Sequence, residues 1–390
     1  MTVAREPWVD ILQPVVPHYR LALFDSLFDR LNGKLRVRAS RNDGGTISSV
    51  TVERPYLDLN HDCVPLLRGR LYWQRDLALT DDARQGDVAV ISGNPRYLST
   101  LRFAQRARRR GLGLVWWGHG WSPTSTRFNT RIRHHLMSRM DAVLVYTEEE
   151  AVELRRVLPG VSVFGAQNAI DQSPIRHARQ LWPDVRLREF KASHGLEDRR
   201  MLLFCGRLRQ EISTGIDLLI DAMSVLTQND PSYLAVVIGD GRDRERLVAL
   251  AEQRGLAAHF RWVGAEYEEA ALAPWFISAH CFVYPGAIGL GLLHAFGYGL
   301  PVITHGDRRR HGPEIAALVH EWNGLEFDAA TPGALVDPIR RLAADPQFRD
   351  GLGRNALETV TSRYSIDVMA DRFLSAIGIA RSRSLRGENA

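Results

Sequence analysis

Cysteine is scarce in this chain of 390 residues, which contains only Cys63, Cys205 and Cys281. Three scattered cysteines exclude a disulfide framework and a thiolate metal site. The sequence also lacks an apolar run as long as a membrane helix, a repeat and a low-complexity tract. Residues 1–8 lack the apolar segment of a secretory signal, so we expect the protein to stay in the cytoplasm.

Lysine is almost absent, since only Lys34 and Lys191 among the 50 basic residues are lysines. The arginine bias is typical of genome composition rather than of function. The scarcity of lysine still matters, because a function that requires a lysine at one position cannot be taken over by another lysine nearby. The net charge of +5 and the pI near 9.3 favour an acidic partner, such as phosphate, a lipid head group or nucleic acid.

Apolar stretches alternate with amphipathic helical patterns along most of the chain. The first half contains predicted strands at Val9–Val16, Val88–Ser92, Leu112–Trp117, Ala142–Tyr146 and Val161–Gly165. The second half contains predicted strands at Met201–Cys205, Ala235–Ile238, Phe260–Val263, Cys281–Tyr284 and Pro301–Thr304. Strands that are apolar throughout predict parallel sheets with helices on both faces. The length and the 45% apolar content are enough for two such domains.

Three motifs follow predicted strands of the second half, at the positions where doubly wound sheets bind ligands. They are Phe204–Leu208 (FCGRL), Ile238–Gly241 (IGDG), and Pro285–Leu290 (PGAIGL) running into Leu293–Ile303 (LHAFGYGLPVI). In order and spacing they resemble the retaining GT-B glycosyltransferases of family 4, across residues 201–327. The closest resemblance is to a bacterial branch with PG-x-x-GL…HA that acts on surface polysaccharides or lipopolysaccharide. Pro17–Arg20 (PHYR) and Trp117–Trp121 (WGHGW) are similar to that branch too.

The resemblance implies an α/β protein of the GT-B fold, with two Rossmann-like domains that face each other across a cleft. The implied domains are an acceptor domain over residues 1–185, a linker over 186–199 and a nucleotide-sugar-binding domain over 200–365. A C-terminal helix or tail follows over 366–390, and one possibility is that it packs on the first domain. The implied activity is transfer of a hexosyl or deoxyhexosyl group from a UDP- or GDP-sugar, with retention. The acceptor would be lipid-linked or a saccharide, with no cofactor and no metal.

The turn before Gly297 has a physical reason to bind a diphosphate. Glycines at the mouth of a helix let the backbone approach phosphate oxygens, and the first helical N–H groups favour negative charge. The alternative is a closely packed strand-to-helix turn. Arg207 follows a predicted strand, where its guanidinium would offset charge on the leaving nucleotide. The predicted donor-binding residues are Gly206, Arg207, Gly239, Gly241, Gly286, Ile288, Gly289, Leu290, His294 and Glu314.

The sequence departs from the family pattern at three donor positions. The family lysine that follows the arginine is missing from Arg209–Gly215, and the basic turn His305–His311 is a candidate replacement or a plain surface loop. Gly286 and His294 occupy the positions of the two family glutamates. His294 is expected either to bond a ribose hydroxyl or to pack in the core. Glu314 either restores a carboxylate or simply suits a helix N-terminus.

His119 lies between two glycines directly after a predicted strand, with Trp116, Trp117 and Trp121 nearby. The resemblance implies that His119 contacts the donor sugar at the reacting centre, so His119 and Arg207 are the predicted catalytic residues. The alternative is a structural histidine in a tight turn. The loops after the first predicted strands supply acceptor-side candidates, namely His18, Tyr19, Arg20, Asn94, Arg96 and Trp121.

The segment between Leu101 and Met140 contains nine arginines and no acidic residue. With Phe128 and Ile132 interleaved, the Arg102–Arg139 region predicts a face for anionic lipid, at about 1 kcal/mol for each cation. That would hold the protein at the inner face of the cytoplasmic membrane. A solvated helix face is the alternative.

Two rival functions stay open. A nucleotide-sugar epimerase on the same fold would need acid and base groups at the sugar and no acceptor. A catalytically silent scaffold would explain the missing lysine and glutamates. Nucleic acid is not an expected partner, because no recognised binding module surrounds the arginines.

Overall fold

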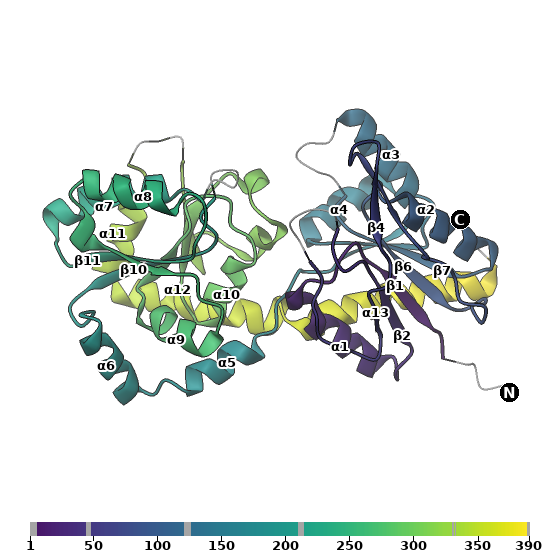
Figure 1. Cartoon of the computed structure of the whole chain (residues 1–390), viewed down its shortest axis with the longest axis horizontal. Helices are drawn as coiled ribbons and strands as arrows, with labels where there is room; N and C mark the ends of the chain where they lie inside the picture. The colour runs from purple at the N-terminus through teal and green to yellow at the C-terminus, as the bar shows by residue number, and fades with distance from the viewer. Residues whose placement is uncertain are drawn as a thin grey trace. The chain divides into compact units, whose positions relative to one another are not determined.

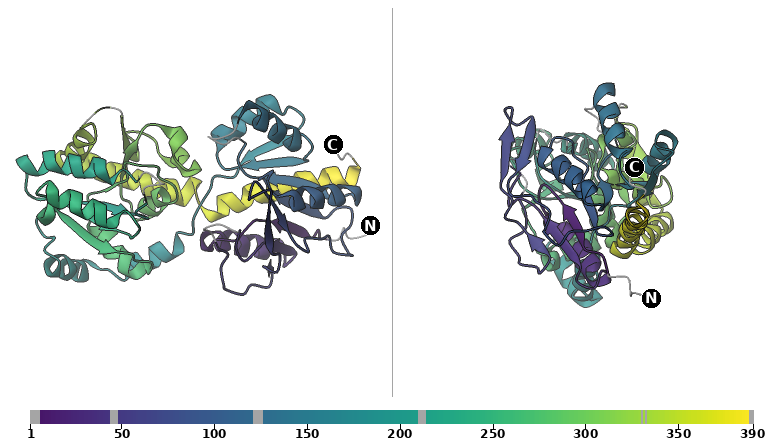
Figure 2. Two further views of the ribbon diagram at one scale, coloured as in Figure 1. Left: turned by 45° about the horizontal axis from the view of Figure 1, so that its top comes forward. Right: turned by 90° about the vertical axis from the view of Figure 1, so that its right-hand side faces the viewer.

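The computed structural model describes residues 6–43, 48–120, 126–209, 214–329, 331 and 333–387. The chain forms two compact units, Met1–Asn168 with Ile366–Ala390, and Ala169–Ser365. Each unit is a parallel sheet with helices on both faces (Figure 1). Figure 2 shows the same layering within each unit from two further directions.

The first unit has a seven-stranded parallel sheet in the order β3-β2-β1-β6-β7-β8-β9. The strands are β1 Val9–Leu12, β2 Leu35–Arg38, β3 Leu57–Asp58, β6 Val88–Ser92, β7 Gly113–Trp117, β8 Ala142–Val145 and β9 Ser162–Gly165. The helices are α1 Leu21–Arg30, α2 Leu98–Arg109, α3 Arg127–Met137, α4 Glu148–Val157 and α13 Ile366–Arg386. The five predicted strands are confirmed. The prediction missed β2, β3 and the antiparallel hairpin of β4 (Cys63–Leu66) and β5 (Leu71–Gln74).

Helix α4 begins directly after Thr147, which is its N-cap residue. The Thr147 hydroxyl accepts a hydrogen bond of 3.1 Å from the Glu150 amide, which caps the first turn of α4. The acidic side chains of that turn suit the positive end of the helix dipole.

The second unit has a six-stranded parallel sheet in the order β12-β11-β10-β13-β14-β15. The strands are β10 Arg200–Cys205, β11 Tyr233–Ile238, β12 Phe260–Gly264, β13 Cys281–Val283, β14 Val302–His305 and β15 Gly324–Phe327. The helices are α5 Ser173–Gln180, α6 Asp184–Ser193, α7 Ile216–Asn229, α8 Arg244–Gln253, α9 Glu269–Ser278, α10 Gly291–Gly297, α11 Val336–Ala344 and α12 Pro346–Glu358. The five predicted strands are again present, whereas β15 was not predicted.

The core of the second unit follows the two-residue period of its strands. Leu202 on β10 lies in register with Ala235 on β11 and with Cys281 on β13. These three side chains belong to the core on one face of the sheet, and the next residue, Leu203, belongs to the core on the other face. Both faces are therefore buried, which explains why the strands are apolar throughout.

The boundary between the units differs from the expected one. Residues 186–199, expected as a linker, fall in α6 and the turn after it, and the second unit begins already at Ala169. Helices α5 and α6 both pack against α9, and Ile175 of α5 is buried in the core. The charges that suggested a linker lie on α6, which contributes no fully buried side chain.

The last helix belongs to the first unit. Helix α13 packs along β7, β8 and α1, and runs beside that sheet in Figure 1. A Cβ on Gly113 of β7 would lie 2.5 Å from the carbonyl oxygen of Ala380, so the glycine permits this close packing. Of the helices that follow residue 330, only α11 and α12 cover the second unit.

Strand order reverses at one point in each sheet. The reversal lies between β1 and β6 in the first unit and between β10 and β13 in the second. Ligands of doubly wound sheets bind outside the carboxyl ends of the strands at such points. The loops after these four strands are therefore where a site is sought.

Candidate functional site

In the second unit the loops after β10 and β11 are locked together through their backbones. The Gly206 amide donates to Ile238 O at 2.9 Å, and the Leu208 amide donates to Asp240 O at 3.0 Å. A Cβ on Gly239 would lie 1.9 Å from Gly206 O, and one on Gly241 would lie 2.1 Å from Leu208 O. These two glycines, predicted to bind the donor, thus brace the loop that carries the next residue of interest.

That residue is Arg207. It follows β10 at the reversal point, is exposed to solvent, and has no hydrogen-bond or ion-pair partner among the described residues. Its guanidinium is therefore available to an anion. Residues 210–213, where the family lysine was found missing, lie outside the described residues.

The turn Pro285–Leu290 offers fewer free amides than the sequence suggested. The Gly286 amide donates to Thr214 O at 3.0 Å, and the Ile288 amide donates to Nδ1 of His311 at 3.1 Å. The amides of Gly289 and Leu290 have no acceptor among the described residues. Helix α10 after them has seven residues. A phosphate at this turn would therefore be bound by these two amides rather than by the dipole of a long helix.

Glu314 brings a carboxylate to the same turn. It lies on a short 3-10 helix at Pro313–Ala317 and is only 4% exposed. A Cβ built on Gly289 would be 3.5 Å from its Oε2 atom. A buried carboxyl group beside Gly289 is suited to accept hydrogen bonds from sugar hydroxyls.

His294 is held by two neighbours on the protein. Its Nε2 lies 2.9 and 3.0 Å from the two carboxylate oxygens of Glu269, which also accepts a hydrogen bond from the Tyr298 hydroxyl. The His294 ring packs edge-on against Phe276, with 4.6 Å between the centroids. Burial acts to raise the pKa of Glu269, but the hydrogen bonds and charge of its partners outweigh it and lower that pKa. The geometry favours the packed histidine over the ribose contact.

The basic turn His305–His311 is partly committed to structure. Arg308 forms an ion pair of 3.0 Å with Glu326 and donates to two carbonyl oxygens of the 3-10 segment. Arg309 and Arg310 are exposed, and Arg310 lines a pocket of about 550 Å³ at the carboxyl ends of β14 and β15. Only these two arginines are left as replacements for the missing lysine.

In the first unit, the loops after β6 and β7 lie against each other. A Cβ on Gly93 would be 2.7 Å from the Cα of Gly118, so only glycine permits this approach. The Gly120 amide donates to Glu150 Oε1 at 2.6 Å and fixes the next turn. His119, between these glycines, lies at the carboxyl end of β7, where it is partly exposed to solvent and partly covered by neighbouring groups.

The rings around His119 differ from those expected. Trp116 and Trp117 are buried in the core, and Trp121 lies outside the described residues. The ring that contacts His119 is Tyr146, with 4.4 Å between centroids. Tyr146 was not predicted, although its place at the end of a predicted strand was a usable signal. Desolvation and the positive charges of two arginines lower the pKa of His119 to about 4, so the ring is neutral at pH 7.

The two arginines are Arg20 and Arg133. Arg20 is buried, donates to Asn168 Oδ1 at 2.6 Å, and lies over the rings of Tyr19 and Trp117 at 5.0 Å. In Arg133 the buried Nε and Nη1 atoms have no hydrogen-bond acceptor among the residues that the structure describes, and burial lowers the pKa of this guanidinium. The sequence analysis grouped Arg133 with the surface arginines of the Arg102–Arg139 region, because its spacing does not distinguish it from them.

The other acceptor-side candidates behave differently from one another. His18 and Tyr19 are exposed at the end of the β1 loop. Arg96 donates to Arg70 O at 2.8 Å and lies over the Tyr72 ring, so its guanidinium holds the β4–β5 hairpin. The Asn94 side chain accepts from the Arg96 amide at 3.2 Å. Arg96 and Asn94, which were predicted to lie on the acceptor side, therefore already have structural partners.

The described ranges contain neither a metal-ligand group nor a membrane-spanning helix. There, no group of three or more His, Cys, Asp or Glu side chains is placed to hold a metal ion. Within the same ranges, no helix has both the length and the apolar character needed to cross a membrane.

Comparison with known proteins shows which proteins this part of the chain is similar to. Residues 187–359 match the family described as glycosyl transferases group 1. The chain is 28% identical over 257 residues to alpha-D-kanosaminyltransferase of Streptomyces kanamyceticus, which covers 61% of this chain and 60% of that protein. It is 30% identical over 151 residues to the lipopolysaccharide core biosynthesis glycosyltransferase LpsD of Rhizobium meliloti, covering 37% and 42%. The chain thus spans less than two thirds of these relatives.

Solved structures extend the likeness to nearly the whole chain. The crystal structure of Anabaena HepE in complex with UDP has a TM-score of 0.66 and 15% identity, covering 95% of this chain and 99% of that one. The fold is therefore GT-B, with two Rossmann-like parallel sheets. The matched family and both of these relatives are described as glycosyltransferases, and this chain is similar to them over the stated residues.

Proposed function

We propose that this chain, whose residues 187–359 match the family described as glycosyl transferases group 1, moves a sugar from a nucleotide diphosphate sugar to an acceptor. The observation that carries the proposal is the reversal point of the second sheet. Arg207 and the amides of Gly289 and Leu290 fall there, all without a hydrogen-bond partner among the described residues, and the family match includes them.

The proposed roles follow from charge. Arg207 and the two amides stabilise the departing diphosphate, where hydrogen bonds to an anion are strongest. Glu314 accepts from hydroxyls of the donor sugar, in place of the carboxylate absent at Gly286. Neutral His119 orients the reacting sugar through a ring nitrogen. We assign the protein to family 4 and expect retention, which proton NMR of the anomeric product would test.

UDP-sugars are the first donors to test, because the structure of HepE is a complex with UDP. GDP-sugars are the second choice. A lipopolysaccharide or lipid-linked surface polysaccharide precursor is the proposed acceptor, supported by the name of LpsD. The relatives are named as transferases, which supports transfer over epimerisation.

The test combines binding and turnover. Thermal melts with UDP and with GDP should reveal one stabilising ligand, since a ligand of the folded state raises stability by mass action. Arg207→Ala should weaken that ligand at least about tenfold, in line with loss of a charge-assisted contact. Arg242→Ala, an exposed arginine in the loop after β11, is the matched control.

Turnover separates the rival functions. A transferase consumes the donor sugar quickly only with an acceptor, whereas an epimerase converts it without one. A silent scaffold would bind neither nucleotide. If Arg207→Ala binds the nucleotide with unchanged affinity, the leaving group does not lie at Arg207 as proposed.

We also propose that α3 rests on an anionic membrane surface. Phe128 is 71% exposed and Ile132 is 41% exposed, one helical turn apart, with Arg127 and Arg131 exposed beside them. The double variant Phe128→Ser/Ile132→Ser should lose co-sedimentation with phosphatidylglycerol vesicles. The pair Val152→Ser/Val157→Ser, exposed on α4, should not. Equal binding to neutral phosphatidylcholine vesicles would contradict the proposal.

A further inference from the structure

A pocket of about 300 Å³ opens at the amino ends of β13 and β14 in the second unit. Its walls are the turn Ser278–His280 before β13, the turn around Leu300 before β14, and side chains from α6 and α12. Arg207 and Gly289 lie at the carboxyl edge of the same sheet. The three residues of β13 put about 10 Å of strand between the two edges, at roughly 3.3 Å per residue. The pocket is separate from the proposed donor site.

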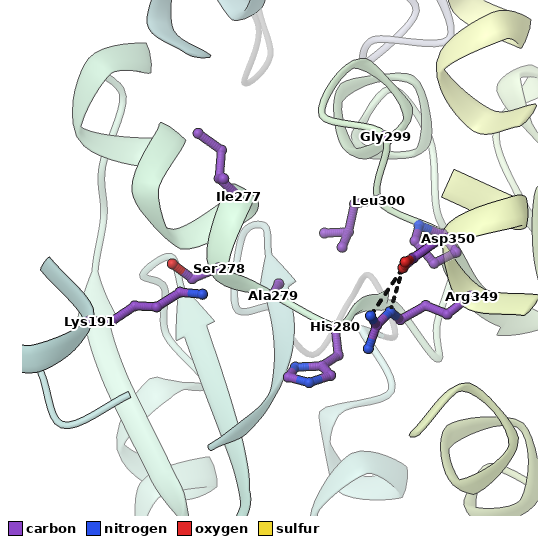
Figure 3. A pocket seen from close by; sticks show the side chains of 10 residues that line it. Lys191, Ile277, Ser278, Ala279, His280, Gly299, Leu300, Arg349 and Asp350 are labelled. Atoms are coloured by element: carbon purple, nitrogen blue, oxygen red, sulfur yellow. Dashed lines mark hydrogen bonds and ion pairs between the residues drawn. The ribbon is translucent and has the colours of Figure 1, made fainter. Parts of the chain in front are cut away.

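The lining of this pocket is basic. Lys191, one of only two lysines in the chain, has no hydrogen-bond or ion-pair partner within the described ranges. Arg349 donates through Nε and Nη2 to Asp350 Oδ1 at 3.1 and 3.0 Å, which leaves Nη1 for another acceptor. Figure 3 shows Lys191 and Arg349 entering from opposite sides, with His280 between them. Asp350 is the only acid among the lining residues, so one positive charge is left uncompensated.

His280 is a neutral donor of known orientation. Its Nδ1 accepts a hydrogen bond of 3.1 Å from the Met201 amide, so the ring proton resides on Nε2. Burial, followed by the charges of Arg349 and Lys191, lowers the pKa of His280 to about 4. The imidazole therefore senses a positive potential and offers an N–H without adding charge.

Ser278 supplies a fourth polar group. The residue is 8% exposed, and its buried Oγ has no hydrogen-bond partner in the described part of the chain. A buried hydroxyl without a partner is destabilising, so an orphan in a pocket wall points to a ligand or to water that satisfies it.

We propose that this pocket binds the phosphate group of a small molecule, as the free ion or as a phosphate monoester. An ammonium, a guanidinium N–H and an imidazole N–H are three donors, and a phosphate has three oxygens or more to accept from them. The volume is at the lower end for small-molecule sites, which suits a sugar phosphate better than a nucleotide sugar. The inference does not depend on the proposed transferase activity.

The two-lysine composition gives a direct test. Reductive methylation with ¹³C-formaldehyde and a borohydride reductant labels Lys34, Lys191 and the α-amino group and keeps their charge. The variants Lys34→Arg and Lys191→Arg identify the two lysine signals. Inorganic phosphate titrated at constant ionic strength should shift the Lys191 signal saturably. Lys34, which lies 4.9 Å from the Trp8 ring, should not respond. No saturable shift, or equal shifts of both signals, overturns the proposal.

Glucose 6-phosphate and glucose distinguish the source of the phosphate. A tighter response to glucose 6-phosphate than to phosphate assigns the site to a monoester, and the reverse order assigns it to the free ion. Glucose alone should have no effect. A response to glucose equal to that of its phosphate would contradict recognition of the phosphate group.

Variants test the lining. Arg349→Met should weaken the phosphate response at least about tenfold, whereas Arg354→Met, exposed on the same helix, should not. Asp350→Asn removes the competing acid and should tighten binding. Arg207→Ala should leave the response unchanged. If Arg207→Ala abolishes it, phosphate binds at the carboxyl edge and this proposal fails. If Arg349→Met does not fold, the response of the Lys191 signal to phosphate in the unaltered chain still tests the proposal.

Discussion

The Ile288 amide donates a hydrogen bond of 3.1 Å to Nδ1 of His311, and His311 Nε2 lies 2.9 Å from the carbonyl oxygen of His305. The second contact requires a proton on Nε2, so the ring is a neutral imidazole with one tautomer. Burial lowers the pKa of His311 and supports that state. The proposed phosphate turn is thus fastened to the end of β14 by one histidine.

We expect His311→Ala to cost about 1–3 kcal/mol in the free energy of unfolding, because the Ile288 amide loses its acceptor. UDP affinity should fall as the turn loosens. His311→Asn retains an acceptor oxygen near the position of Nδ1 and should recover part of both losses. Urea unfolding and UDP titration provide the measurements. Equal losses in the two variants would exclude the hydrogen bond as the cause.

The Glu269 carboxylate predicts a pH dependence of stability. Its folded pKa is lowered, so its contribution is present above the unfolded pKa of about 4.5 and is lost as the pH falls through the folded value. Glu269→Gln should unfold more easily than the unaltered chain at pH 7. The difference in unfolding free energy between the two proteins should become smaller below about pH 4.5. Glu268→Gln, exposed beside it, is the control, and a gap that stays constant down to pH 3 would contradict the assignment.

Sequence predicted the strands well because both faces of each sheet are buried. In Val88–Ser92 all five positions are buried and the first four residues are apolar, so the strand was recognisable from its sequence. The same logic failed for the expected linker at 186–199. Helix α6 buries no side chain completely, so its sequence carries no strong apolar stripe to distinguish it from a connection.

The site was less predictable, because its properties are set by contacts distant in sequence. The acceptor of the Ile288 amide comes from His311, 23 positions later, and the anchor of His294 comes from Glu269, 25 positions earlier. Residue type and spacing do not report such pairs. Composition likewise could not separate Arg133, with its buried guanidinium, from the exposed arginines on the same helix.

His119 should titrate far below an ordinary histidine. Its pKa of about 4 means that the fold loses stability as the pH falls from about 6.5 towards 4, where the unfolded chain binds a proton and the folded chain does not. Arg133→Met removes a nearby positive charge and should raise this pKa, which NMR titration of the ring can follow. An unchanged pKa in that variant would contradict the electrostatic cause.

Transfer activity provides a second test of His119. His119→Ala should reduce kcat about a hundredfold if the ring orients charge at the reacting centre. The exposed His177 on α5 is the matched control, and His177→Ala should leave kcat unchanged. An acid limb in the activity profile near pH 6.5 that disappears in His119→Ala would show a protonated ring and refute the neutral one.

Gly239 tests the bracing of the Arg207 loop. Its φ of 144° is unfavourable for other residues, and an added Cβ would lie 1.9 Å from Gly206 O, so the backbone itself must move. Gly255 has a positive φ of 71° but no atom near its Cβ position, so Gly255→Ala isolates the backbone strain, about 1–2 kcal/mol. We expect Gly239→Ala to destabilise well beyond that and to weaken UDP binding, while Gly255→Ala leaves binding intact. Equal unfolding free energies for the two variants would show that the loops after β10 and β11 are not mutually braced.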